Sequence, residues 1–336
     1  MEKNHLFSVD FLKFVAALMI TNSHFQLLYE PLTPSLATFG VHGNALFFFV
    51  SGFLLMRSFE KHGLTNIIDW YKVKFRRLWP PVIIWTLWSA VVWKMQFSVS
   101  ELLLATKYWF VQSIAINFLL FYGILKVQAI VKSCSMENSL KIVFGVSIAV
   151  SVIYFFMMPN AVGSVYHTKF HYICHFSIMI MGAIVYRRKY RWKNITKRDA
   201  VLLFLSFILY FIFMGIGKNH NNVLYNIQIL ALLPLHTFVY YSFKIANSRK
   251  LNAILNYGFF SRFISVVAAL TLEIYVVQFV VITDKFNGIF PVNIIINLIL
   301  ILIAAYWLKV LTSVFLQVLN LEPFNLGMLV NQSKTT

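Results

Sequence analysis

The first apolar stretch of the chain carries three side chains that could do acid–base chemistry, namely Asp10, Lys13 and His24. On one continuous helix Lys13 and His24 share a face, because eleven residues make three turns plus about 20°. Asp10 lies one turn before Lys13, close enough to pair with it. An imidazole titrates near neutral pH, so His24 suits a general base or a nucleophile. An ion pair at the membrane boundary and a hydrogen-bonded structural histidine explain the same residues without catalysis.

Two other polar residues in apolar stretches are candidates for orienting groups. His42 lies in the second apolar stretch, residues 38–56, near the end expected at the outer membrane surface. Its expected depth in the membrane is close to that of His24, so one expectation is an outer site that contains both histidines. Glu273 is the most isolated carboxylate in any apolar stretch, with Tyr275 and Gln278 as candidate partners. A carboxylate in the membrane is costly unless it is protonated, paired or functional. A structural, hydrogen-bonded glutamate is therefore the alternative to a functional one.

The remaining histidines give weaker signals. His167, His171 and His175 fall at i, i+4 and i+8, which places them on one face if they share a helix. Without a carboxylate or cysteine partner at metal-ligand spacing, we expect no metal site there or elsewhere. His5, His62, His220 and His236 are interpreted as surface or packing residues.

Four cations are interleaved with aromatic residues just before the third apolar stretch. They are Lys72, Lys74, Arg76 and Arg77, within the segment 70–81. One interpretation is a positively charged anchor with an aromatic belt at the inner membrane surface. The other is a clamp for a ligand with several phosphates, for which Lys74, Arg76 and Arg77 are the candidates. A nucleotide-like donor fits such a clamp, whereas bulk nucleic acid does not.

Membrane helices must position these side chains. Of the 336 residues 60% are hydrophobic and only 12% are charged, against roughly 25% in soluble proteins, which excludes a water-soluble globule. The sequence predicts an all-α integral membrane protein, a bundle of about ten transmembrane helices in a single domain over residues 1–336. The predicted spans are residues 6–28, 38–56, 79–97, 108–127, 141–158, 172–187, 200–217, 223–243, 263–283 and 291–318.

The distribution of lysine and arginine predicts the topology. With the N-terminus inside, 22 of the 29 Lys and Arg fall in inner segments and five in outer ones, leaving Lys13 and Lys309 within spans. By the positive-inside rule, both termini are then cytoplasmic. Within the second span, Gly43 and Gly52 are expected to let helices approach closely.

Five motifs in the same order resemble those of the membrane acyltransferase 3 family. They are Lys13-x10-His24, the run from Gly43 to Phe53 with Ser51-Gly52, Lys74-x-x-Arg77-Leu-x-Pro80, Tyr108-Trp109-Phe110, and Thr271-x-Glu273-Ile274-Tyr275. Each motif is short, but together they extend over nearly the whole chain. Two positions depart from the family pattern. Lys74 stands where the arginine motif has arginine, and Gln278 stands where the ninth-span motif closes with histidine.

The resemblance implies an O-acyltransferase of a bacterial inner membrane. In that family a cytoplasmic acyl-CoA, usually acetyl-CoA, donates its acyl group to a hydroxyl of a glycan or lipid-linked sugar on the far side of the bilayer. His24 would be the catalytic histidine and Lys13 its basic partner, held by Asp10. Lys74 and Arg77, helped by Arg76, would hold the donor. Some members of the family carry an appended esterase-like domain; we expect none here, so the membrane domain would choose the acceptor.

Two other functions fit parts of the sequence. In a secondary transporter or flippase for a glycan or anionic solute, the buried charged residues would form an ion or proton relay. The basic segments would then only set the topology. A non-catalytic membrane subunit would leave the spacing of Lys13 and His24 unexplained.

Overall fold

The described part of the chain is helical throughout. The computed structural model describes residues 7–131, 134–157, 170–188, 195–218, 223–248, 251, 253 and 258–319, and these contain helices and no strand, which confirms the all-α class. His5, His167 and His220 lie outside the described residues, as do both chain ends. The α-helices are α1 (Phe7–Asn22), α2 (Gly40–His62), α3 (Ile67–Trp93), α4 (Val99–Leu104), α5 (Trp109–Val131), α6 (Met136–Met157), α8 (Phe170–Arg187), α9 (Lys197–Lys218), α10 (Leu232–Ala246), α12 (Gly258–Ala269), α13 (Thr271–Val281) and α14 (Val292–Val318); the 3-10 helices are η1 (Gln26–Tyr29), η2 (Pro34–Leu36), η3 (Val223–Ala231) and η4 (Asn287–Ile289).

Several of these helices are long and apolar enough to cross a membrane. Among the described residues six segments qualify: Pro34–His62, Trp109–Val131, Met136–Met157, Lys197–Ile216, Leu224–Ala246 and Val292–Val318. The pair α12 and α13 qualifies together as a seventh, with a bend of 72°. Helices α1, α3 and α8 occupy three other predicted spans without meeting the same test. A multi-pass membrane protein is therefore supported, while the count of ten spans and the orientation of the termini stay predictions.

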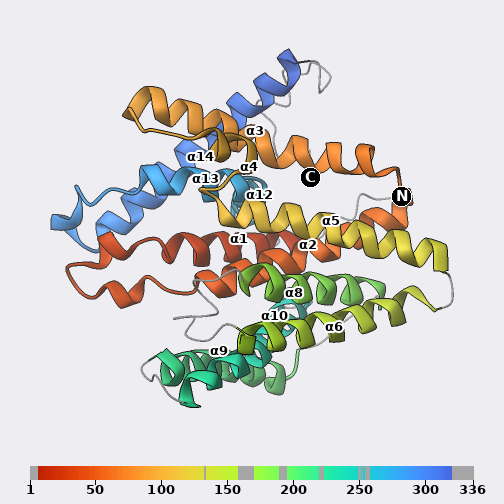
Figure 1. Cartoon of the computed structure of the whole chain (residues 1–336). Coiled ribbons are helices and arrows are strands. Elements are labelled where there is room, and N and C mark those ends of the chain that lie inside the picture. The colour runs from red at the N-terminus through yellow and green to blue at the C-terminus, as the bar shows by residue number, and fades with distance from the viewer. Residues whose placement is uncertain are drawn as a thin grey trace. The chain divides into compact units, whose positions relative to one another are not determined.

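The chain divides into two compact units. The first combines residues 1–12, 44–65 and 117–257; the second combines residues 13–43, 66–116 and 258–336. The single domain predicted over residues 1–336 stays a prediction. In the first unit, α6 packs along α8, and α9 packs along α10 and η3 (Figure 1). In the second unit, α3, α13 and α14 pack on one another. The second unit holds every candidate site residue except Asp10.

In the first unit, glycines bring α2 and α8 into backbone contact. A Cβ atom built on Gly52 would lie 1.8 Å from the carbonyl oxygen of Met179. One built on Gly182 would lie 2.0 Å from the carbonyl oxygen of Phe49. In the second unit, a Cβ on Gly43 would lie 2.7 Å from the carbonyl oxygen of Ala16 on α1. The close approach predicted for Gly43 and Gly52 is confirmed.

We expect Gly52→Ala to destabilise the protein by about 1–3 kcal/mol, because the obstructing atom is backbone and the helices must separate. Thermal unfolding of the purified protein in detergent measures the effect. The matched control is Gly145→Ala on α6, where nothing lies within 4 Å of the added carbon. That control should be neutral or stabilising, because alanine favours the helix over glycine. Equal unfolding temperatures for the two variants would contradict the packing argument.

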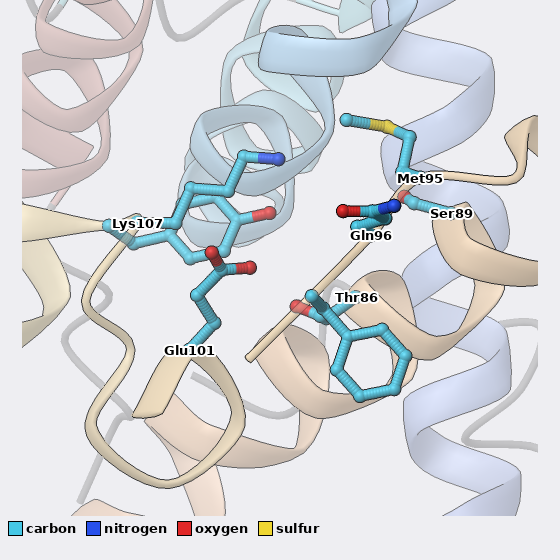
Figure 2. A pocket seen from close by; sticks show the side chains of 8 residues that line it. Thr86, Ser89, Met95, Gln96, Glu101 and Lys107 are labelled. Atoms are coloured by element: carbon cyan, nitrogen blue, oxygen red, sulfur yellow. The ribbon is translucent and has the colours of Figure 1, made fainter. Parts of the chain in front are cut away.

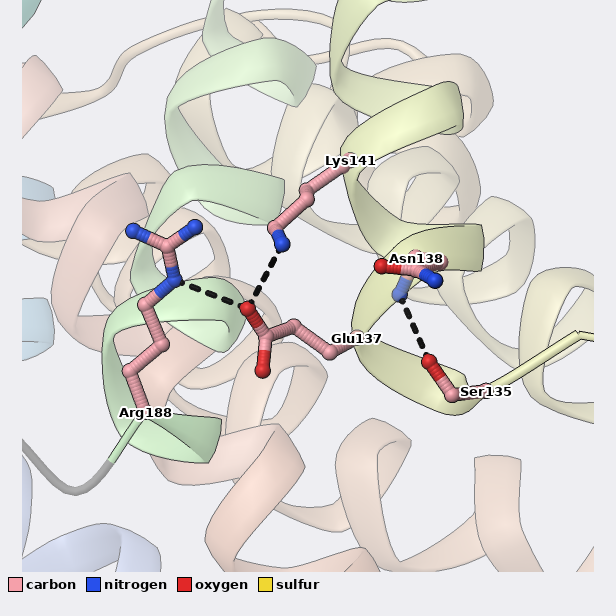
Figure 3. A network of polar contacts seen from close by, with 5 residues as sticks. All are labelled: Ser135, Glu137, Asn138, Lys141 and Arg188. Carbon is pink, nitrogen blue, oxygen red and sulfur yellow. Dashed lines mark hydrogen bonds and ion pairs between the residues drawn. The ribbon is translucent and has the colours of Figure 1, made fainter.

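Ion pairs tie the ends of helices together in the first unit. The Glu137 carboxylate at the start of α6 accepts from Lys141 Nζ at 2.8 Å and from Arg188 Nε at 3.0 Å (Figure 3). Arg187 likewise pairs with Glu60 at the end of α2. Because these side chains are partly exposed to solvent, each pair contributes little to stability. Their effect is to fix which helix ends lie side by side.

In the second unit, α14 is anchored to the segment that follows α1. The Asn293 side chain donates to the carbonyl oxygen of Leu28 at 3.0 Å, and the Asn287 side chain donates to that of Leu27 at 2.7 Å. Asn293 is fully buried, so its hydrogen bonds replace those that water cannot make. These contacts hold the chain just beyond His24 in place.

Candidate active site

His24 lies in a turn rather than on a helix. Helix α1 ends at Asn22, and the His24 amide donates to the carbonyl oxygen of Thr21 at 3.0 Å, which tightens the chain into a 3-10-like turn. The prediction that Lys13 and His24 share one helical face is therefore wrong, because it assumed α-helical rotation up to residue 24. His24 is half-buried in the turn between α1 and η1.

Side-chain hydrogen bonds define this turn. The Asn22 amide donates to the carbonyl oxygens of Leu36 at 2.9 Å and Thr38 at 3.1 Å. The Asn22 side-chain oxygen accepts from the Tyr29 hydroxyl at 2.7 Å. Through these three hydrogen bonds, Asn22 at the end of α1 holds the segment that leads to α2. The His24 backbone is held by these bonds independently of any ligand.

The His24 ring packs on a cluster of aromatic side chains that come from the motif beginning at Tyr108 and from helix α13. Its centroid lies 4.7 Å from that of Phe279 on α13, in an edge-on contact. Phe279 in turn lies 5.8 Å from Tyr108 and 5.4 Å from Tyr275. Phe110 completes the cluster at 5.1 Å from Tyr275. The structure therefore joins His24, the motif beginning at Tyr108 and the ninth-span motif in one unit.

Glu273 forms an ion pair with a lysine that is distant from it in the sequence. Its Oε1 atom lies 3.1 Å from Lys309 Nζ on α14. Glu273 is 2% exposed, whereas Lys309 is 30% exposed. The sequence suggests Tyr275 and Gln278 as its partners, whereas the structure shows this ion pair. A lysine alone in a long apolar stretch also needs a counter-ion, and that signal could have identified the pair.

Gln278 is fully buried on α13, and neither atom of its side-chain amide has a hydrogen-bond partner among the described residues. An amide left unpaired in the interior costs about 1–3 kcal/mol per group. Gln278 thus places an unpaired hydrogen-bond donor and an unpaired acceptor one residue before Phe279, which belongs to the His24 cluster. The sequence singles out Gln278 as a candidate partner of Glu273 and as a departure from the family pattern, and neither interpretation predicts an unpaired amide.

The three other candidates on α1 and α2 are buried. Asp10 and Lys13 are each 5% exposed, one turn apart on α1. His42 is fully buried on α2, next to the glycine at which α2 meets α1. The ring contact that His24 makes is with Phe279, and the two-histidine outer site stays a prediction.

The cation cluster lies on the first half of α3. That helix begins at Ile67, after an Asn66 cap whose side chain accepts from the Asp69 amide, and continues without a break into the third predicted span. Lys74 Nζ lies 5.1 Å from the centre of the Trp70 ring, one turn earlier. Burial, and then the charge of Arg77, lower the pKa of the Lys74 ammonium from its ordinary value. A bound anion would offset both effects.

Arg76 is half-buried, and its Nε atom is fully buried without a hydrogen-bond partner among the described residues. Arg77 is exposed. The Nε–H group of Arg76 can therefore donate a hydrogen bond to an oxyanion that binds beside it. The cluster combines two guanidinium groups and one partly desolvated ammonium on about one turn of helix.

Histidines in the first unit form a separate polar group. On α8, His171 and His175 have ring centroids 5.8 Å apart with the ring planes tilted by 33°, on one face as their spacing predicts. His236 Nε2 lies 2.8 Å from the Ser177 hydroxyl, and its Nδ1 lies 2.7 Å from the carbonyl oxygen of Leu232. His236 is thus a buried, hydrogen-bonded residue that links α8 to α10. Among the described residues, no group of three or more His, Cys, Asp or Glu side chains could hold a metal ion.

A family model described as an acyltransferase domain matches residues 6–318, nearly the whole chain. The matched range contains all the candidate residues of both units, from Asp10 to Lys309. No curated protein and no solved structure matches the chain.

Proposed function

Because the chain belongs to the acyltransferase 3 family, we propose that it transfers an acetyl group from cytoplasmic acetyl-CoA to a hydroxyl of a cell-surface or lipid-linked glycan. The membrane would be the bacterial cytoplasmic membrane, with the acceptor on its outer side. The observation that carries this proposal is the family match over residues 6–318. The proposal assigns roles to residues whose positions have been described above.

His24 acts at the reacting hydroxyl. As a general base, it takes the proton of the acceptor hydroxyl while the oxygen attacks the thioester carbonyl. The carbon–sulfur bond then breaks, the proton passes to the CoA thiolate, and an ester and free CoA–SH leave. As a nucleophile, it would first carry the acyl group on its ring nitrogen and then pass it to the hydroxyl. The contact with Phe279 orients the ring for either route.

Lys74, Arg76 and Arg77 hold the phosphates of the donor. The buried Nε of Arg76 and the partly desolvated ammonium of Lys74 support this role, because both gain from an anionic partner. Lys13, buried on α1, would be the basic partner of His24 and would be held by Asp10, while His42 and Glu273 would be orienting groups. No protein-bound metal enters the proposed reaction.

The test of donor binding compares acetyl-CoA with acetyl-pantetheine, which lacks the phosphates. We expect Arg77→Ala to raise the KM for acetyl-CoA by roughly 10-fold or more, because the variant loses one charge-assisted hydrogen bond to a phosphate. The same variant should leave the KM for acetyl-pantetheine unchanged. Lys74→Arg should lower the KM for acetyl-CoA, because it restores a second bidentate group.

The control for charge at the inner surface is Lys61→Ala, an exposed cation near the end of α2. It should bind both donors as the wild type does. An Arg77→Ala effect that is equal for the two donors would contradict the phosphate clamp. If the wild type consumes no acyl-CoA in lipid, the proposed activity itself is wrong.

A transporter for a glycan or anionic solute is the second candidate. Two observations favour it, the bend of 72° between α12 and α13 and the buried Glu273 carboxylate paired with Lys309, since broken helices and buried charges recur in transporters. Solute flux into vesicles without acylation would distinguish it from the enzyme.

A further inference from the structure

Two fully buried asparagines lie near the beginning of α14, in the second unit. Asn293 and Asn297 are one helical turn apart and are both inaccessible to solvent. Burying a side-chain amide in an apolar helix is costly unless its donor and its acceptor are both used, so such residues hydrogen-bond to neighbouring segments. Each of these asparagines donates to a main-chain carbonyl oxygen outside α14. Their partners therefore show which parts of the chain α14 holds.

Asn293 holds the segment that follows His24. Its Nδ2 atom donates to the carbonyl oxygen of Leu28 at 3.0 Å and to the side-chain oxygen of Asn287 at 2.9 Å. Asn287 in turn donates to the carbonyl oxygen of Leu27 at 2.7 Å. Leu28 comes four residues after His24 and is fully buried. Two consecutive carbonyl groups beyond His24 are thus bound by side chains at the start of α14 and just before it.

Asn297 holds the segment that follows Phe279 in a similar way. Its side-chain oxygen accepts from the Thr283 amide at 2.9 Å, and its Nδ2 atom donates to the Thr283 carbonyl oxygen at 3.1 Å. Thr283 comes four residues after Phe279, just beyond the end of α13. Two bonds to one residue fix the orientation of its backbone as well as its position. Near the other end of α13, Glu273 pairs with Lys309, so both ends of α13 are fixed to α14.

Packing alone constrains the ring contact between His24 and Phe279 only in part. The Phe279 side chain is 38% exposed. Tyr108, on which Phe279 packs, borders a small cavity that Ser89 and Glu101 also line and that has room for about one water molecule (Figure 2). A ring with this much freedom can shift unless its backbone is held. The hydrogen bonds from α14 supply that constraint.

We propose that Asn293 and Asn297 are positioning residues for His24. By binding the two segments that carry the His24 and Phe279 rings, they set the contact between these rings, whose centroids lie 4.7 Å apart. A displacement of about 1 Å at a catalytic group lowers a rate by roughly 100-fold. The catalytic meaning of this inference rests on the proposed function, whereas the geometry that it predicts does not. If the asparagines served stability alone, their loss would leave the His24 ring contact unchanged.

The first readout is the NMR signal of the His24 ring, in lipid-reconstituted protein that carries carbon-13-labelled histidine. The signal is assigned by its loss in His24→Ala. The ring current of Phe279 displaces it, and Phe279→Leu measures that displacement. Asn293→Leu and Asn297→Leu keep a branched side chain but remove the hydrogen bonds. Both should move the signal most of the way to its position in Phe279→Leu.

The second readout is turnover of acetyl-CoA. We expect Asn293→Leu and Asn297→Leu to lower kcat by roughly 10-fold or more and to leave the KM for acetyl-CoA unchanged, because the proposed donor clamp lies on α3. Asn287→Ala removes bonds in a partly exposed loop with little risk to folding. It should change both readouts in the same direction by a smaller amount.

The matched control is Thr312→Val, which removes a buried hydrogen bond elsewhere on α14 and should leave the signal and kcat unchanged. The proposal is overturned if the His24 signal keeps its wild-type position in the folded asparagine variants, if Thr312→Val moves it equally, or if it moves without a change in kcat. Should the leucine variants not fold, Asn287→Ala decides between these outcomes. Failure of the proposed activity would appear separately, as wild-type protein that shows the expected signal shifts on substitution but never consumes acetyl-CoA.

Discussion

Replacement of His24 by alanine should lower acyl transfer by at least roughly 10²–10⁴-fold, because the variant loses the group that accepts the proton or carries the acyl group. The Asn22 hydrogen bonds that shape the turn do not involve the His24 ring, so the variant should fold normally. Release of CoA–SH by protein in lipid, with labelled acetate followed into protein and glycan, measures the effect.

Two comparisons separate chemistry from structure in this experiment. His62→Ala removes an exposed histidine on α2 and should leave transfer unchanged. Imidazole added to His24→Ala should restore part of the activity, since the removed ring leaves space against Phe279. Wild-type turnover in His24→Ala would exclude His24 as the catalytic group.

Lys309→Met should destabilise the protein by about 3–5 kcal/mol, because it leaves the buried Glu273 carboxylate without its counter-ion. Glu273→Gln should cost less, since the partly exposed Lys309 can extend its ammonium towards water. Thermal unfolding in detergent measures both effects.

The double variant Glu273→Gln with Lys309→Met should recover most of the lost stability, because no charge remains buried. Lys285→Met, at an exposed lysine before η4, is the control for loss of a cation, and it should leave the stability of the protein unchanged. Additive losses in the double variant would mean that the 3.1 Å contact does not couple the two residues.

Hydrophobic patterning predicted the helical class well. Each of the ten apolar stretches contains at least one helix, because a backbone in an apolar surrounding must satisfy its own hydrogen bonds. The presence of glycines within the second span also predicted correctly that Gly43 and Gly52 lie at close helix contacts. These features depend on local composition, which a single sequence displays.

Contacts between distant segments were not predictable in the same way. Lys309 and Glu273 are 36 residues apart, and helical rotation carries no information on which face of α14 meets α13. The end of α1 was missed because Asn22 is held by carbonyls of residues 36 and 38, a tertiary interaction that stops the helix before His24. The cavity at Ser89 likewise depends on how α4 folds back on α3.

The glycine contacts between α2 and α8 constrain how this sequence can change over evolution. At Gly52 and at Gly182 the nearest obstructing atom is a main-chain carbonyl oxygen. Every amino acid carries that atom, so no substitution on the facing helix can make room for a side chain. A mutation at either glycine therefore has no compensating partner mutation at the contact, and descendants of this chain should retain both glycines even where the surrounding residues diverge.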